Sequence, residues 1–123
     1  MRTGLVALVF AFVVPAAVAG PTVFRAPGRT VYCELGDRPP PVVLTCWRAT
    51  DGRSIAMLPT RRALVSSDKN TRDLHKDGAP VLQFGRTWRN GSYRCTSRRL
   101  GVTCTNRSRH GWWLGRYKGY RLF

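Results

Sequence analysis

Four cysteines are the residues of this sequence with the clearest chemistry: Cys33, Cys46, Cys95 and Cys104. An even number of cysteines in a small chain with an export signal, described below, is typical of a disulfide framework. Neither local pair has the Cys-x2-Cys spacing of a zinc site, and no odd cysteine remains as a nucleophile. We therefore expect two disulfides, no metal and no cofactor, with three pairings possible.

The segment from Tyr93 to Asn106 favours local pairing of the last two cysteines. When "YRCTS" and "VTCTN" pair as antiparallel strands, Cys95 faces Cys104, and a four-residue loop, 98–101, ends in glycine. Directly opposed residues in such a pair lie close enough for a disulfide after modest adjustment.

The first two cysteines show the same arrangement. "VYCEL" and "VLTCW" flank the turn-forming segment "GDRPPP", and placing Cys33 opposite Cys46 also places Leu35 opposite Leu44. The sequence thus favours a Cys33–Cys46 bridge together with a Cys95–Cys104 bridge.

The histidines and carboxylates give little support to an enzyme. A small basic nuclease would need a positioned acid and base, which His110 and Glu34 could supply, with Arg94 or Arg116 on the phosphate. Nothing in their spacing requires this, and His110 precedes a glycine between two predicted strands, as a turn residue would. The chain has no Gly-x-Ser-x-Gly, His-Glu-x-x-His or phosphate-binding loop. We expect a non-enzymatic protein, with a small secreted nuclease or toxin as the alternative.

Arginines are interspersed with aromatic residues over the last thirty residues and suggest a binding surface. Strand alternation sends Trp112 and Trp113 to opposite faces, so one belongs to the core and the other to the surface. An exposed tryptophan beside arginines suits sugar stacking or binding of an anionic polymer. The candidate binding residues are Arg94, Arg98, Arg107, His110, Trp112, Trp113, Arg116 and Tyr117.

The predicted hairpin itself carries part of this surface. Its face opposite Cys95 combines hydroxyl and guanidinium groups, from Arg94, Thr96, Arg98, Thr103, Thr105 and Arg107. The alternative is a solvated strand surface in a chain whose arginine content reflects GC-rich codons.

The first residues predict export. A positive Arg2, an unbroken apolar run from Leu5 to Val14 and the sequence Ala17-Val18-Ala19 are typical of a secretory signal peptide. The apolar run is too short for a membrane span, which takes about twenty residues. We expect cleavage near Ala19–Gly20, which divides the chain into a signal peptide, 1–19, and a single secreted β domain, 20–123.

The net positive charge of the chain indicates which class of partner it would bind. The chain has 21 Lys and Arg against 6 Asp and Glu, and removal of residues 1–19 takes away only Arg2, leaving +14. Such a protein is drawn to anionic polymers and surfaces. Outside the cell these are envelope polymers, acidic glycans or an acidic protein; nucleic acid suits the charge but rarely shares this compartment. We expect a monomer without a transmembrane segment.

Short runs rich in β-branched and aromatic residues, separated by glycine and proline, predict an all-β fold. They indicate a small disulfide-linked barrel or sandwich of antiparallel strands. Between Ala49 and Pro80 the sequence is polar and weakly patterned, which predicts a long middle loop.

The C-terminal half contains the motifs Cys-x-Ser, Gly-Val-Thr-Cys-x-Asn and His-Gly, and "FRAPGRTVYC" lies near the start of the mature chain. Through these motifs, much of the mature chain resembles a family of uncharacterised secreted proteins from high-GC Gram-positive bacteria. The matching positions are Phe24, Pro27, Val31, Cys33, Leu82, Phe84, Gly85, Trp88, Gly91, Cys95, Ser97, Gly101, Val102, Thr103, Cys104, Asn106, His110 and Gly111.

Three features depart from that family pattern. The middle of this chain lacks the extra cysteine pair common in the family, Arg109 stands where glycine is usual, and Trp112 and Trp113 stand where phenylalanine is usual. The resemblance implies secretion and disulfides but no chemistry. We expect an extracellular or envelope-associated binding module.

Overall fold

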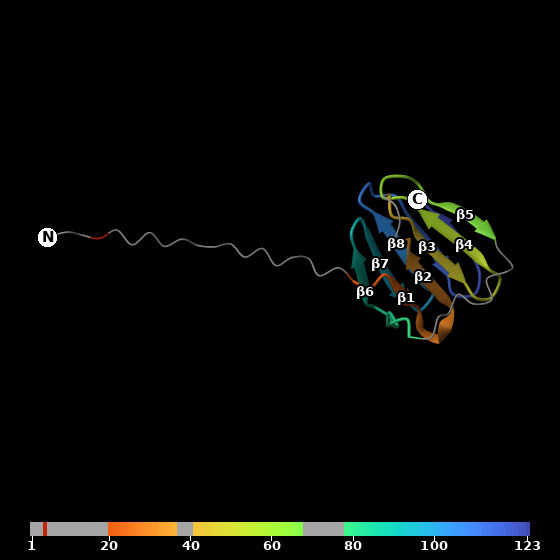
Figure 1. Ribbon diagram of the computed structural model, residues 1–123. Coiled ribbons are helices and arrows are strands. Elements are labelled where there is room, and N and C mark those ends of the chain that lie inside the picture. The colour runs from red at the N-terminus through yellow and green to blue at the C-terminus, as the bar shows by residue number, and fades with distance from the viewer. Residues whose placement is uncertain (1–3, 5–19, 37–40, 68–77) are drawn as a thin grey trace.

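The computed structural model describes residues 4, 20–36, 41–67 and 78–123 and consists of two antiparallel five-stranded sheets. Sheet A has the order β1-β2-β3-β4-β5 and sheet B the order β10-β9-β8-β7-β6, and Figure 1 shows the two sheets face to face. The elements are β1 Val23–Arg25, η1 Pro27–Arg29, β2 Val31–Leu35, β3 Leu44–Arg48, β4 Arg53–Met57, β5 Leu64–Ser67, β6 Thr87–Asn90, β7 Tyr93–Arg98, β8 Gly101–Asn106, β9 Gly111–Gly115 and β10 Tyr120–Leu122. The all-β prediction is confirmed, as a sandwich instead of a barrel.

The core forms between the sheets because alternate residues of each strand point inward. In β7 the buried residues are Tyr93, Cys95 and Ser97, and in β3 they are Leu44, Cys46 and Arg48. One apolar cluster draws on both sheets, with Trp112 as its largest fully buried side chain. Trp112 therefore belongs to the core, and its neighbour Trp113 points to the outside of sheet B.

Both disulfides have the predicted pairing. Cys33 faces Cys46 across β2 and β3, and Cys95 faces Cys104 across β7 and β8, with Cα–Cα distances of 4.1 Å in each pair. Each bridge therefore fixes the register of one hairpin, and with it which side chains reach the outer face.

Two predicted loops are wrong. The β7–β8 pairing continues to Arg98 and Gly101, so this loop contains two residues instead of four. The predicted middle loop contains β4 and β5, in which Ile55 and Met57 alternate into the core. These strands form because β3 offers a hydrogen-bonding edge and an apolar face, which outweighs their weak local pattern. Residues 68–77, also in this predicted loop, lie outside the described part.

Polar side chains join the sheets at several points. Arg48 is buried and donates to the carbonyl oxygens of Gly115, at 3.2 Å, and Gly119, at 2.7 Å. The Tyr93 hydroxyl donates to the carbonyl of Met57 at 2.8 Å, and the Asn106 side chain donates to that of Leu58 at 2.9 Å. These bonds hold sheet B at a fixed position over sheet A.

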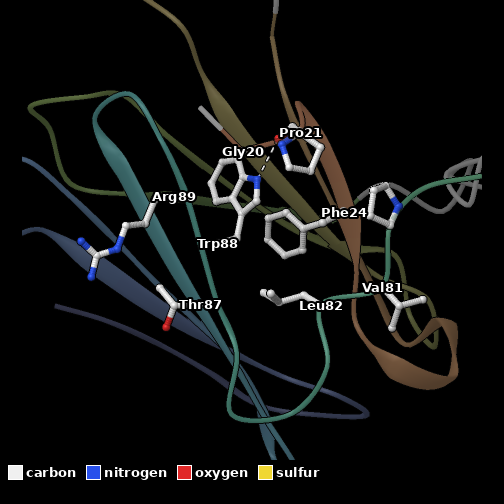
Figure 2. A pocket seen from close by; sticks show the side chains of 9 residues that line it. Gly20, Pro21, Phe24, Val81, Leu82, Thr87, Trp88 and Arg89 are labelled. Atoms are coloured by element: carbon white, nitrogen blue, oxygen red, sulfur yellow. Dashed lines mark hydrogen bonds between the residues drawn. The ribbon is translucent and has the colours of Figure 1, made fainter. Parts of the chain in front are cut away.

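On one side of the sandwich the chain covers the edges of β1 and β6. The Leu82 N–H donates to the Arg25 carbonyl of β1 at 2.8 Å, and the Gly20 N–H donates to the Arg89 carbonyl of β6 at 2.8 Å. Figure 2 shows the Trp88 indole N–H bonded to the Pro21 carbonyl at 2.7 Å. The Phe24 and Trp88 ring centroids lie 4.9 Å apart beneath this segment. In the described residues no helix is long and apolar enough to span a bilayer.

Candidate binding surface

The outer face of sheet B carries cations, hydroxyls and an aromatic ring in an ordered grid. Three rows cross the strands, because directly paired residues point to the same side of a sheet. We call this surface the basic face; its residues are Thr87, Arg89, Arg94, Thr96, Arg98, Thr103, Thr105, Trp113 and Arg121.

The middle row is mainly hydroxyl. It runs Thr87, Thr96, Thr103, Trp113 and Arg121 from β6 to β10. The Thr87 and Thr96 hydroxyl oxygens lie 3.2 Å apart and share a hydrogen bond. Every threonine hydroxyl can both donate and accept, so this row offers hydrogen bonds to a polar ligand without fixing its charge.

Three of the four arginines of the grid lie on its first two strands, β6 and β7, and the fourth, Arg121, lies on β10. Arg94 stands opposite Arg89 on one side and opposite Thr105 on the other, and Arg98 lies on the same strand as Arg94. All three arginines are exposed. Five of the residues border a shallow depression of about 270 Å³: Arg94, Thr96, Arg98, Thr103 and Thr105.

No carboxylate neutralises this surface from its own sheet. Residues 78–123, which contain all of sheet B, include no Asp or Glu. Their cations are Arg86, Arg89, Arg94, Arg98, Arg99, Arg107, Arg109, Arg116, Lys118 and Arg121. Among the described residues, the carboxylates are Glu34 and Asp51, of which Asp51 pairs with the buried Arg48 of sheet A. The electrostatic potential over the basic face is therefore positive.

Three predicted binding residues lie on the basic face: Arg94, Arg98 and Trp113. Trp112 does not, because it is fully buried in the core and cannot contact a ligand. Arg107, predicted to continue the hairpin face beyond Thr105, is exposed but follows the end of β8 and lines a different hollow, beside Tyr93, so it lies outside the basic face.

The remaining three predicted residues belong to turns. The His110 N–H donates to Asn106 Oδ1 at 3.1 Å, and the His110 carbonyl accepts the Asn106 N–H at 2.9 Å, which closes the β8–β9 turn. Arg116 turns toward sheet A, donates to the Pro27 carbonyl at 3.3 Å and stacks on Tyr117 at 5.2 Å from the ring centroid. Tyr117 is exposed in the β9–β10 turn.

The acid–base pair considered for a nuclease is divided between the sheets. Glu34 lies on β2 next to the inward-facing Cys33, so its side chain belongs to the outer side of sheet A. His110 lies in a turn of sheet B. Whether the protein catalyses a reaction stays a prediction.

Sequence reasoning missed Arg89, Thr87 and Arg121. Asn90-Gly91 signals a turn, but a two-residue loop made of these residues would place Arg89 opposite Ser92. In the structure Asn90 pairs with Tyr93, so the loop is Gly91-Ser92 and Arg89 stands opposite Arg94. Arg121 becomes part of the face only through the pairing of β10 with Trp113.

Comparison with known proteins gives one match. A family model described as a family of unknown function (DUF6636) matches residues 47–123, which include β4 to β10 and hence the whole basic face. No curated protein and no solved structure matches the chain.

Proposed function

The chain belongs to the family of unknown function DUF6636, and we propose that it is an exported protein that binds an anionic polymer through its basic face. The match supports the prediction of an uncharacterised family and adds no activity. The proposal therefore depends on the surface itself.

The single observation that carries it is the direct opposition of Arg89 and Arg94 on β6 and β7. Like charges placed opposite each other destabilise a sheet. Here both side chains are exposed, and their own sheet offers no carboxylate as a counter-ion. An anionic ligand would offset this repulsion, because each guanidinium can bind a carboxylate, sulfate or phosphate group through two hydrogen bonds.

The shape of the surface suits an extended ligand. The depression is shallow and crosses strands instead of closing around a small molecule. Three threonine hydroxyls follow one another along the middle row, and Arg89 and Arg94 stand side by side in the adjacent row, so an extended polymer can contact several of these groups at once. Many weak contacts of this kind give binding that falls steeply with salt.

Export is supported by two independent features. The first nineteen residues have the pattern of a signal peptide. The four cysteines form two disulfides, each within one hairpin. Disulfides of this kind persist in oxidising compartments. The partner would then be a polymer of the cell envelope or of the extracellular medium.

The test is retention of the oxidised protein on isolated envelope fractions and on purified polyanions across a salt series. A protein of matched size and charge, such as a basic domain without this fold, serves as the control. We expect stronger retention than the control on at least one envelope fraction. Equal retention of both proteins on every anionic material would contradict the proposal.

A further inference from the structure

The Trp113 side chain lies on a floor of glycines, on the outer side of sheet B. A Cβ atom on Gly101 would lie 2.7 Å from the indole Nε1, and one on Gly115 would lie 3.0 Å from Cη2. One on Gly119 would lie 3.3 Å from Cζ3. Atoms at both ends of the indole thus contact glycine backbone, so the ring lies along the sheet instead of standing away from it.

Several strands combine to hold the ring in this position. Gly101 belongs to β8, Gly115 to β9, and Gly119 to the turn before β10. The buried guanidinium of Arg48 fixes this floor from below, since it binds the carbonyls of Gly115 and Gly119. The orientation of the ring is therefore set before any ligand arrives, which lowers the entropic cost of binding.

A second ring, that of Phe123 just after β10, lies over another glycine of β9. Gly111 lies one row along β9 from Trp113, and a Cβ atom there would lie 2.6 Å from the Phe123 ring. Phe123 is 45% exposed, and Trp113 is partly exposed. In the described part, arginine side chains stack on Tyr120, Phe84 and Tyr117, and none stacks on Trp113.

The grid places three kinds of group at fixed spacing from Trp113. Neighbouring strands lie about 4.8 Å apart, so Thr103 is one strand away and Arg94 and Arg98 are about 10 Å away, on β7. The hydroxyls of Thr96 and Thr103 lie between the ring and the cations. Arg121 stands directly opposite Trp113 on β10. A ligand that crosses the face from Trp113 toward β6 meets an apolar plane, then hydrogen-bonding groups, then the arginines of β7 and β6.

We infer that the ligand is an acidic polysaccharide, with a sugar ring stacked on Trp113 and its acidic groups on the arginines of β7. This inference rests on the proposed function. The axial C–H groups of a pyranose form an apolar plane that packs against an aromatic face, and its hydroxyls match the threonine row. A polyphosphate has no such ring and would use the arginines alone. Single-stranded nucleic acid binds where aromatic rings and cations lie side by side. Here only Arg121 stands beside Trp113, and the other arginines of the basic face lie on β6 and β7, two or more strands from the ring.

The test compares three probes of known chemistry: alginate, a polymer of uronic acids; inorganic polyphosphate; and poly(dT). Dissociation constants are measured with the oxidised full-length chain and its Trp113→Thr and Trp113→Tyr variants. Near-ultraviolet circular dichroism and thermal unfolding check that each variant keeps its fold. Arg89→Thr/Arg94→Thr provides a face that retains Trp113 with fewer charges.

We expect Trp113→Thr to weaken alginate binding by roughly three- to ten-fold, which is the range that an aromatic contact contributes, while polyphosphate affinity changes by less than about two-fold. Trp113→Tyr should recover most of the alginate affinity because it retains a ring. Equal effects of Trp113→Thr on both probes, or no effect on either, would overturn the inference, as would tighter binding of poly(dT) than of alginate.

Failure of the proposed function has a different signature. In that case alginate and polyphosphate would each bind the original chain and Arg89→Thr/Arg94→Thr with the same dissociation constant. If polyphosphate binding depends on the two arginines while alginate binding ignores Trp113, the basic face is a polyanion site and only the sugar platform is refuted.

Discussion

Arg89 and Arg94 stand directly opposite each other on β6 and β7, in a sheet whose sequence contains no carboxylate. Such a pair opposes folding, and a sheet usually places a neutral or acidic residue at one of the two positions. This pair on an exposed, hydroxyl-rich surface is the observation on which the proposed ligand site depends.

Removing one charge of this pair should stabilise the protein in the absence of ligand. We expect Arg89→Thr to raise the free energy of unfolding by about 0.2–1 kcal/mol at low salt, and by less at high salt. Denaturant unfolding of the oxidised protein measures this change. Arg98→Thr is the matched control, because Arg98 faces Gly101 and has no cation directly opposite. A larger gain from Arg98→Thr than from Arg89→Thr would contradict the account.

Arg48 and Asp51 should make stability depend on pH in the acid range. Hydrogen bonds from the Arg48 guanidinium, at 2.9 and 2.8 Å, hold the pKa of Asp51 below its usual value. A carboxylate whose pKa is lowered by folding stabilises the native state above its unfolded pKa, about 3.9, and this contribution disappears as the pH falls through the lowered folded pKa.

Asp51→Asn should therefore destabilise the protein at neutral pH, by about 1–2 kcal/mol because Asp51 is partly exposed and its charge is screened. The difference from the original chain should shrink as the pH falls below about 4. Unfolding free energies measured from pH 2 to pH 7, with Thr50→Ala in the same turn as the control, follow both effects. A difference that is constant over this range would show that the ion pair has no role.

The two hairpin disulfides should contribute comparable amounts to the free energy of unfolding. Replacing Cys95 and Cys104 by alanine opens a loop with a sequence separation of 9, and the corresponding separation for Cys33 and Cys46 is 13. The chain-entropy model gives losses of about 2.7 and 3 kcal/mol. Denaturant unfolding of the two double variants tests these values. Loss of the first pair without loss of stability would show that the β7–β8 register is held by other contacts.

Gly20 should accept no side chain. A Cβ atom there would lie 2.6 Å from the Arg89 carbonyl oxygen and 3.0 Å from the Trp88 indole. We expect Gly20→Ala to displace the segment from the edge of β6 and to cost about 1–3 kcal/mol through lost hydrogen bonds.

The control for this change is Gly36→Ala, where the nearest atom to a Cβ would lie 3.6 Å away and the added methyl has room. Its effect should stay within about 0.5 kcal/mol. Thermal unfolding compares the two variants. If Gly20→Ala proves as mild as Gly36→Ala, the edge cover is not rigid.

Local pattern was sufficient to predict the hairpins. Opposed cysteines, alternating side chains and nearby glycines determined two registers, and through them the outward direction of Arg94, Thr96 and Arg98. The two strands of the middle region could not be predicted, because Ile55 and Met57 form a strand only when β3 supplies an edge and a core. The orientation of Trp113 likewise depends on Gly101 and Gly119, which meet it only after the strands have paired.

The most direct test of the basic face counts the ions released when polyphosphate binds. The slope of log affinity against log salt is measured for the original chain, Arg89→Thr/Arg94→Thr and Arg61→Thr/Arg62→Thr. The last variant removes the same charge from exposed positions beside β5 of sheet A. We predict that Arg89→Thr/Arg94→Thr reduces the magnitude of the slope by about 0.7 for each arginine removed, which is the value for flexible single-stranded nucleic acid. Arg61→Thr/Arg62→Thr should keep a slope close to that of the original chain. Equal losses in the two variants would show that polyphosphate responds to net charge alone, and that sheet B carries no binding site.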